Sequence, residues 1–216
     1  MTRFLTILLG IVIVLAFITG PVVFALHEQR QMKHFRVVRD GVLYRSGQMT
    51  EEGLKRTLHD YLIRTVITLR DKRAPGQSPP DLAEEKYCRD QGINYVRIPP
   101  RTWDAHDGDA PADEGVRRFK EVMSDPGHYP VLIHCFNGIH RSGAYCAVYR
   151  MEFERWTNER AIAEIKACGY FNLDQEMDIL GYLEEYVPGW KIELQPASIH
   201  PVDRVNIPVK KPQMKQ

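Results

Sequence analysis

The segment "VLIHCFNGIHRSG", Val131 to Gly143, joins an apolar run to a short loop and then to the start of a helical pattern. The run "VLIH" is apolar up to His134, which is typical of a strand that is buried on both faces of a parallel sheet. Cys135 follows at once, and Arg141 opens the helical pattern. Because ligands in open α/β sheets bind beyond the carboxyl ends of the strands, this junction predicts both a fold class and the position of a site.

Strand and helix patterns alternate on the N-terminal side of this junction. "FRVVRDGVLYRSGQ" alternates apolar and polar residues about Asp40-Gly41, which predicts a hairpin. Helix patterns then alternate with strand patterns: "TEEGLKRTLHDY", "RTVITLRD", "SPPDLAEEKYCRDQG", "INYVRIPP", "PADEGVRRFKEVMSDPG" and "PVLIHC". Further helices are expected from Arg141 to about Trp156, in "NERAIAEIKACG" and in "LDQEMDILGYLEEY". We expect an α/β fold with a mostly parallel central sheet of about four to five strands, flanked by helices.

The chain divides into three predicted parts, which are residues 1–34, 35–187 and 188–216. The first contains the uncharged stretch 4–26, which is long enough to cross a bilayer as one transmembrane helix and is followed by a polar connector. A cleaved signal peptide is the alternative interpretation. The second part is the expected catalytic domain, and the third, rich in proline and lysine, is expected to be extended or disordered.

The side of the membrane is indicated only by the basic residues after the apolar stretch, which are Arg30, Lys33, Arg36 and Arg39. By the positive-inside tendency they favour a single-pass protein with its domain in the cytoplasm. The very short N-terminal tail favours the opposite orientation.

Composition excludes several classes of function. With 29 basic and 28 acidic side chains, the net charge of +1 provides no global field that would attract nucleic acid. The four cysteines form no CxxC pair, which argues against a disulfide framework or a structural zinc site. Because the net charge is close to zero, any anion-binding site must depend on a few neighbouring residues.

The loop from Cys135 to Arg141 combines a thiol with groups that attract anions. Backbone N–H groups of such a loop, together with the N-terminus of the helix behind it, can bind a phosphate-sized dianion. Arg141 adds a planar guanidinium that can donate hydrogen bonds to two oxygens of one anion, and the same positive surroundings favour the thiolate of Cys135. A metal site built from His134, Cys135 and His140 is disfavoured because no further cluster completes a four-ligand set. We therefore expect neither a metal nor a cofactor.

These residues carry a family resemblance. HCx5R followed by Ser resembles the signature of the cysteine-dependent protein tyrosine and dual-specificity phosphatases. Together with "YRSGQ", the segment "HCFNGIHRSG" looks most like the small atypical dual-specificity phosphatases of bacteria, fungi and plants, some of which act on inositol pyrophosphates. The resemblance covers about Val37 to Tyr186 and implies a tyrosine-phosphatase-like fold.

The resemblance also implies roles for individual residues. Cys135 would attack phosphorus, and Arg141 with the loop amides would stabilise the equatorial oxygens. Ser142 would assist departure of the sulfur, and His134 would support the loop from beneath. The residues expected to line the bound phosphoryl group are Phe136, Asn137, Gly138, Ile139, His140 and Arg141.

The general acid of such enzymes is an aspartate about 30 residues before the cysteine, on a mobile loop. Here "RTWDAHDGDAPADEG" offers three candidates. We favour Asp104, which follows the strand pattern "INYVRIPP" and has Trp103 as an aromatic neighbour, and we keep Asp107 as the alternative. Asp109, close to Pro111, is better explained as a helix-capping residue.

The sequence therefore predicts a membrane-anchored phosphatase acting on phosphotyrosine, and on phosphoserine or phosphothreonine, through a phosphocysteine. The substrate would be a phosphorylated protein or a small phosphorylated molecule. One alternative is an inositol phosphate, inositol pyrophosphate or phosphoinositide phosphatase, although Phe136, Asn137 and Ile139 bring no lysine to the loop. The other is a pseudophosphatase that binds phosphorylated partners, which the presence of a nucleophile, an arginine and an acid disfavours.

Overall fold

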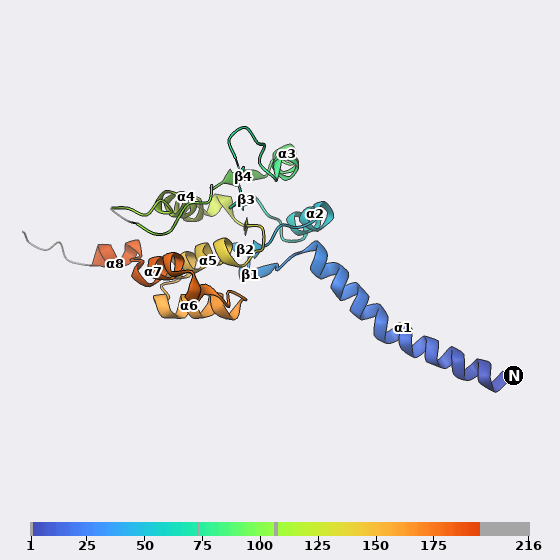
Figure 1. Ribbon diagram of the computed structural model, residues 1–216. Coiled ribbons are helices and arrows are strands. Elements are labelled where there is room, and N and C mark those ends of the chain that lie inside the picture. Colours follow the sequence, from blue (N-terminus) through green and yellow to red (C-terminus); the bar gives the residue numbers. More distant parts are fainter. Residues whose placement is uncertain (1, 73, 106–107, 195–216) are drawn as a thin grey trace, which may run out of the picture. The chain divides into compact units, whose positions relative to one another are not determined.

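A five-stranded sheet lies at the centre of the structure, a computed structural model that describes residues 2–72, 74–105 and 108–194. The strands are β1 (Arg36–Arg39), β2 (Leu43–Ser46), β3 (Thr65–Thr68), β4 (Asn94–Arg97) and β5 (Val131–His134). Their order is β1-β2-β5-β3-β4 (Figure 1). β1 pairs antiparallel with β2, and the other neighbours pair parallel, which confirms the predicted mostly parallel sheet.

Helices cover both faces of this sheet. The helices of the described residues are α1 (Thr2–Gln31), α2 (Glu51–Asp60), α3 (Leu82–Asp90), α4 (Asp113–Ser124), α5 (His140–Phe153), α6 (Asn158–Ala167), α7 (Met177–Glu185) and α8 (Gly189–Leu194), with short 3-10 turns η1 (Pro126–His128) and η2 (Leu173–Gln175). Side chains of α2 and α3 pack on one face, and those of α4 to α7 pack on the other (Figure 1). One compact unit extends to Tyr186, and a second begins at Val187 and includes α8.

Local sequence explains where several elements begin. Gly41 has φ +69° in the hairpin between β1 and β2, a conformation that favours glycine. The Thr50 hydroxyl accepts from the Gly53 amide at 3.1 Å and caps α2. The Thr157 hydroxyl accepts from the Arg160 amide at 3.3 Å and caps α6. Gly41 thus permits the hairpin turn, and the two threonines fix the first residues of α2 and α6.

Two predictions about the C-terminal region are wrong in detail. The single helix expected in "LDQEMDILGYLEEY" is divided into η2 and α7 at Glu176, whose backbone is not helical. The Glu176 carboxylate accepts from the Tyr170 hydroxyl at 2.6 Å and from Asn172 Nδ2 at 2.8 Å, so it holds the preceding turn instead of continuing the helix. Residues 189–194, expected to be extended or disordered, form α8. The rest of the tail, 195–216, lies outside the described residues.

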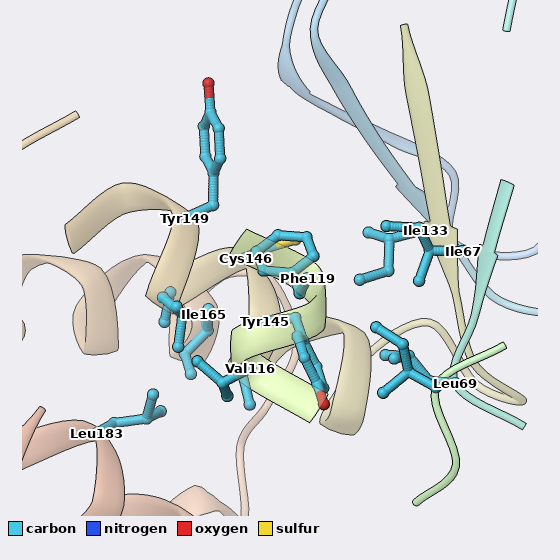
Figure 2. Packing of buried hydrophobic residues seen from close by; sticks show 14 of the residues in the cluster. Ile67, Leu69, Val116, Phe119, Ile133, Tyr145, Cys146, Tyr149, Ile165 and Leu183 are labelled. Carbon is cyan, nitrogen blue, oxygen red and sulfur yellow. The ribbon is translucent and has the colours of Figure 1, made fainter. Parts of the chain in front are cut away.

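The larger part of the hydrophobic core lies between the sheet and α4 to α7. The rings of Phe119 and Tyr145 meet edge to face at 5.3 Å, beside Ile67 and Ile133 of the central strands (Figure 2). A smaller cluster fills the opposite face and contains Tyr44, Leu54, Leu58, Ile63, Val66, Cys88 and Leu132. Because β3 and β5 are buried on both faces, they hold the loops at their carboxyl ends rigidly.

The apolar N-terminal stretch lies within α1, so its prediction as a helix is correct. In the described part of the chain, however, no helix combines the length and the apolar character that crossing a membrane requires. The predicted transmembrane span at residues 4–26 is therefore not confirmed.

Candidate active site

The site lies where three neighbouring strands end. Ser46 of β2 and Thr68 of β3 both pair with His134 of β5, so the carboxyl ends of these strands are level. The residues that follow His134 and Thr68 therefore leave the sheet side by side, and the amide of Leu69 donates to the carbonyl of His134 at 2.8 Å. This register brings Cys135 to the edge at which the sequence placed it.

The loop from Cys135 to Arg141, called here the cysteine loop, depends on a close contact between two glycines. Gly138 has φ +75°, and a Cβ atom added to it would lie only 2.2 Å from the amide nitrogen of Gly47. A Cβ added to Gly47 would in turn lie 2.8 Å from the carbonyl oxygen of Asn137. Only glycine fits at either position, so the "SG" of "YRSGQ" and the "NG" of the cysteine loop form one packed unit.

Hydrogen bonds from an earlier part of the chain fasten the cysteine loop. The Gln48 amide donates to the carbonyl of Phe136 at 3.1 Å. His34 Nδ1 lies 2.6 Å from the carbonyl oxygen of Asn137, and Lys33 Nζ donates to Asn137 Oδ1 at 2.9 Å. The loop is therefore held from outside as well as from within.

Cys135 is buried, with 2% of its surface exposed, and donors surround its sulfur. The Gly138 amide donates to Sγ at 3.1 Å, and the Ser142 hydroxyl lies 3.5 Å from it. Burial alone would raise the pKa of the thiol, but hydrogen bonds from the Ser142 hydroxyl and from the Ser142 and Gly138 amides, with the charge of Arg141, lower the pKa below its ordinary value. This environment stabilises a thiolate.

Arg141 lies in the first turn of α5, and its Nη1 donates to the carbonyl of Leu69. This hydrogen bond anchors the guanidinium to the end of β3, next to the cysteine loop. Its positive charge contributes to the lowered pKa of Cys135. Loop amides, the N-terminus of α5 and Arg141 together provide a binding place for a tetrahedral anion.

His134 is buried beneath the loop beside acidic side chains. Its Nε2 forms an ion pair with Glu84 Oε1 at 2.7 Å, although the geometry is not that of a hydrogen bond, and its Nδ1 has no hydrogen-bond partner in the described part of the chain. Burial lowers the pKa of the imidazole, but the charges of Glu84 and Asp81 outweigh this and raise the pKa. The role of His134 as a support for the loop stays a prediction.

Asp81, Glu84 and His134 bring their ligand atoms within 4.8 Å of one another, a spacing that could suit a metal ion. The Asp81 oxygens already accept from Thr68, Tyr95 and Arg97, at 2.6, 3.0 and 2.7 Å. Because the guanidinium of Arg97 already supplies the positive charge, this cluster is better described as a buried hydrogen-bond network than as a cation site.

The three candidate general acids, Asp104, Asp107 and Asp109, differ in what the structure shows of each. Trp103 is buried and packs edge to face on Tyr145 at 5.5 Å and on Tyr182 at 4.9 Å, so it anchors the segment that carries Asp104. Asp104 itself is exposed, and Asp107 lies outside the described residues. The capping role predicted for Asp109 is wrong, because α4 begins at Asp113 and its N-cap position is Ala112.

His140 and Ile139 connect the loop to the segment between α6 and α7. The His140 ring stacks on Tyr170 at 4.7 Å, and Ile139 lies close to Gly169. Of the predicted ligand-lining residues, Phe136 is half exposed and Gly138 is buried at the loop centre.

Sequence reasoning missed three residues that shape this site. Lys33 and His34 fall in the predicted polar connector, and Gly47 falls near the end of the predicted hairpin segment. The glycine directly after β2 was a usable signal, because a glycine at such a position suggests close approach of another backbone. The sequence contains no comparable signal for Lys33 and His34, since their contacts depend on the tertiary fold.

Comparison with known proteins places this geometry in context. The family model described as "PTP-NADK: DSP-PTPase phosphatase fused to NAD+ Kinase" matches residues 22–178. A probable chloroplastic NAD kinase 2 of Oryza sativa is 27% identical over 52% of this chain and 11% of that protein. Dual specificity protein phosphatase TpbA of Pseudomonas aeruginosa is 33% identical over 30% of each protein. The chain thus spans less than a third of the length of these curated relatives.

Solved structures share the fold. The core catalytic domain of the PP-IP phosphatase SIW14 from S. cerevisiae, in complex with citrate, has a TM-score of 0.54 and 19% identity, and the match covers 72% of this chain and 86% of that one. A Cys-to-Ser variant of P. aeruginosa TpbA in complex with pTyr has a TM-score of 0.51 and 19% identity, covering 67% and 79%.

Proposed function

Since this chain belongs to the family of DSP-PTPase phosphatases and is a hydrolase of the dual-specificity and tyrosine phosphatase type, we propose that it hydrolyses phosphotyrosine, and phosphoserine or phosphothreonine, through a phosphocysteine. The observation that carries this proposal is the thiol of Cys135, held by the Gly138 amide and Ser142 beside Arg141. A TpbA structure contains pTyr, which supports phosphotyrosine as a substrate class.

The proposed reaction begins with in-line attack of the Cys135 thiolate on phosphorus. The sulfur–phosphorus bond forms as the bond to the leaving oxygen breaks, and Asp104 gives that oxygen a proton. Arg141 and the loop amides stabilise the equatorial oxygens. Water activated by the same aspartate then attacks phosphorus, and the sulfur leaves as a thiolate that receives a hydrogen bond from Ser142.

Turnover of 4-nitrophenyl phosphate tests this proposal. We expect release of 4-nitrophenolate that is unaffected by a chelator and abolished by Cys135→Ser. The matched control is Cys168→Ser, which removes a thiol at the end of α6 and should leave turnover unchanged. Binding of phosphorylated ligands without turnover would instead favour a pseudophosphatase.

A second candidate function is hydrolysis of inositol phosphates, inositol pyrophosphates or phosphoinositides. Two cations beside the cysteine loop, Lys33 and Arg70, favour it, because highly charged substrates need positive charge outside the loop itself. A substrate panel of phosphopeptides, phosphoinositides and inositol polyphosphates distinguishes the two candidates by their relative kcat/KM.

We also propose that α1 attaches the protein to a membrane, with the catalytic domain on the cytoplasmic side. Large apolar side chains from Phe4 to Phe24 are exposed along this helix, and basic residues follow it. The protein should remain in the membrane fraction after a carbonate wash. Recovery in the soluble fraction, or a shortened product, would contradict attachment through an uncleaved helix.

A further inference from the structure

A pair of cations flanks the one half-exposed aromatic side chain of the cysteine loop. The Phe136 ring is 51% exposed, and Lys33 Nζ lies 4.3 Å from its centroid. The guanidinium carbon of Arg70 lies 5.6 Å from the same centroid. We call Lys33, Phe136 and Arg70 the basic rim. They come from the connector after α1, from the cysteine loop and from the segment after β3.

The position of the basic rim is fixed relative to Cys135. The Lys33 carbonyl accepts from the Gly47 amide at 2.7 Å, and its ammonium donates to Asn137. Arg70 follows Leu69, whose carbonyl accepts from Arg141. Lys33 itself, and Leu69 just before Arg70, thus form hydrogen bonds with residues that shape the cysteine loop. A ligand bound in that loop would therefore lie next to both cations.

The charges of the basic rim are not neutralised by acids. Within the described residues, neither Lys33 nor Arg70 forms an ion pair, and Asp71, the acid next in sequence, accepts from the amide of Lys72. Arg70 is only 8% exposed, and its Nη1 has no hydrogen-bond partner in the part of the chain that the structure describes. A buried guanidinium without a counter-ion is costly, so an arriving anion would be stabilised there.

We propose that the basic rim is a second anion-binding subsite, which selects phosphoesters that carry another anionic group beside the scissile phosphate. The inference rests on the proposed function, because the scissile phosphate is assumed to occupy the cysteine loop. Arg70 is the main specificity determinant. Lys33 assists it while also holding Asn137, and both cations lie near the ring of Phe136 in the cysteine loop.

Two matched substrate pairs test the subsite and distinguish the sources of the second charge. The first is fructose 1,6-bisphosphate against fructose 6-phosphate, and the second is a phosphotyrosine peptide with a neighbouring Glu against the same peptide with Gln. The wild-type protein should prefer the more anionic member of at least one pair by roughly tenfold in kcat/KM, the effect of one hydrogen bond to a charged group. The preference should weaken with added salt.

Arg70→Gln should remove most of this preference while reducing turnover of 4-nitrophenyl phosphate far less. Lys33→Gln should also reduce the preference for the more anionic substrate, whereas Lys33→Arg, which keeps the positive charge, should retain it. Lys86→Gln, which removes an exposed cation from α3, is the matched control and should change neither measurement. Thermal melting curves confirm that each variant folds.

An equal loss on singly and doubly anionic substrates in Arg70→Gln would overturn the subsite, as would a wild-type protein with no preference in either pair. Calorimetry with Cys135→Ser, titrated with the same pairs, measures the binding preference without catalysis. A binding preference without turnover in the wild-type protein would therefore refute the phosphatase proposal and leave the subsite standing.

Discussion

Gly138→Ala is the substitution that most sharply tests the packing of the cysteine loop. The new Cβ would lie 2.2 Å from the Gly47 nitrogen and 2.5 Å from the carbonyl carbon of Ser46, whereas ordinary contact begins at 3.4 Å. The neighbours are backbone atoms, so the loop or the end of β2 must move by about 1 Å. A displacement of that size costs roughly 10²-fold in rate when it affects groups that position a reacting atom.

The loss of stability that we expect in Gly138→Ala has two sources. The left-handed conformation at φ +75° costs a non-glycine residue about 1–2 kcal/mol, and overpacking adds about 1–3 kcal/mol. Gly41→Ala is a matched control, because Gly41 has φ +69° but no atom lies within 4 Å of the point that its new Cβ would occupy. It should therefore cost only about 1–2 kcal/mol of stability and leave kcat/KM within about twofold.

Both variants are assayed by urea unfolding and by turnover of 4-nitrophenyl phosphate in the absence of urea. We expect Gly138→Ala to remain folded and to lose roughly 100-fold in kcat/KM. The reasoning would be refuted if Gly138→Ala kept full activity, or if both alanine variants lost activity equally.

Three further outcomes are expected. Asp104→Ala should slow aryl phosphate turnover by roughly 10²–10⁴-fold, the contribution of a general acid. If only Asp107→Ala slows turnover in this way, the general acid is Asp107 and not Asp104. Ser142→Ala should raise the pKa of Cys135, seen as a shift to higher pH in its alkylation by iodoacetate; an unshifted curve would contradict the hydrogen bond. Glu84→Gln should destabilise the protein by roughly 1–3 kcal/mol in urea titrations near pH 6. Because Glu84 raises the folded pKa of His134, this loss should be fully present below the unfolded pKa and fade as pH rises through the folded one; a loss constant with pH would contradict it.

Much of the fold followed from local patterns. The Asp40-Gly41 hairpin, the helix in "TEEGLKRTLHDY" and the apolar strand before Cys135 each depend on a few adjacent residues, and each appears where the sequence predicted it. The break at Glu176 was not predictable, because it depends on hydrogen bonds from Tyr170 and Asn172 that form only in the folded chain.

The candidate site divides in the same way. Cys135, Arg141 and Ser142 share one turn, so their spacing in the sequence was enough to bring them together. Lys33 and Arg70 lie far from that turn in sequence, and only the strand order places them beside Phe136. Local motifs were thus enough to predict that Cys135, Arg141 and Ser142 lie together, whereas the surroundings of the site required the tertiary structure.

The central claim is that the sulfur of Cys135 forms a covalent bond to phosphorus during turnover. Rapid quenching of the reaction with an aryl phosphate, followed by mass spectrometry of the peptide that contains Cys135, tests it directly. We expect one phosphoryl group on Cys135 in the wild-type protein and in Asp104→Ala, and none in Cys135→Ser. Turnover without that adduct, or sustained turnover by Cys135→Ser, would contradict the account.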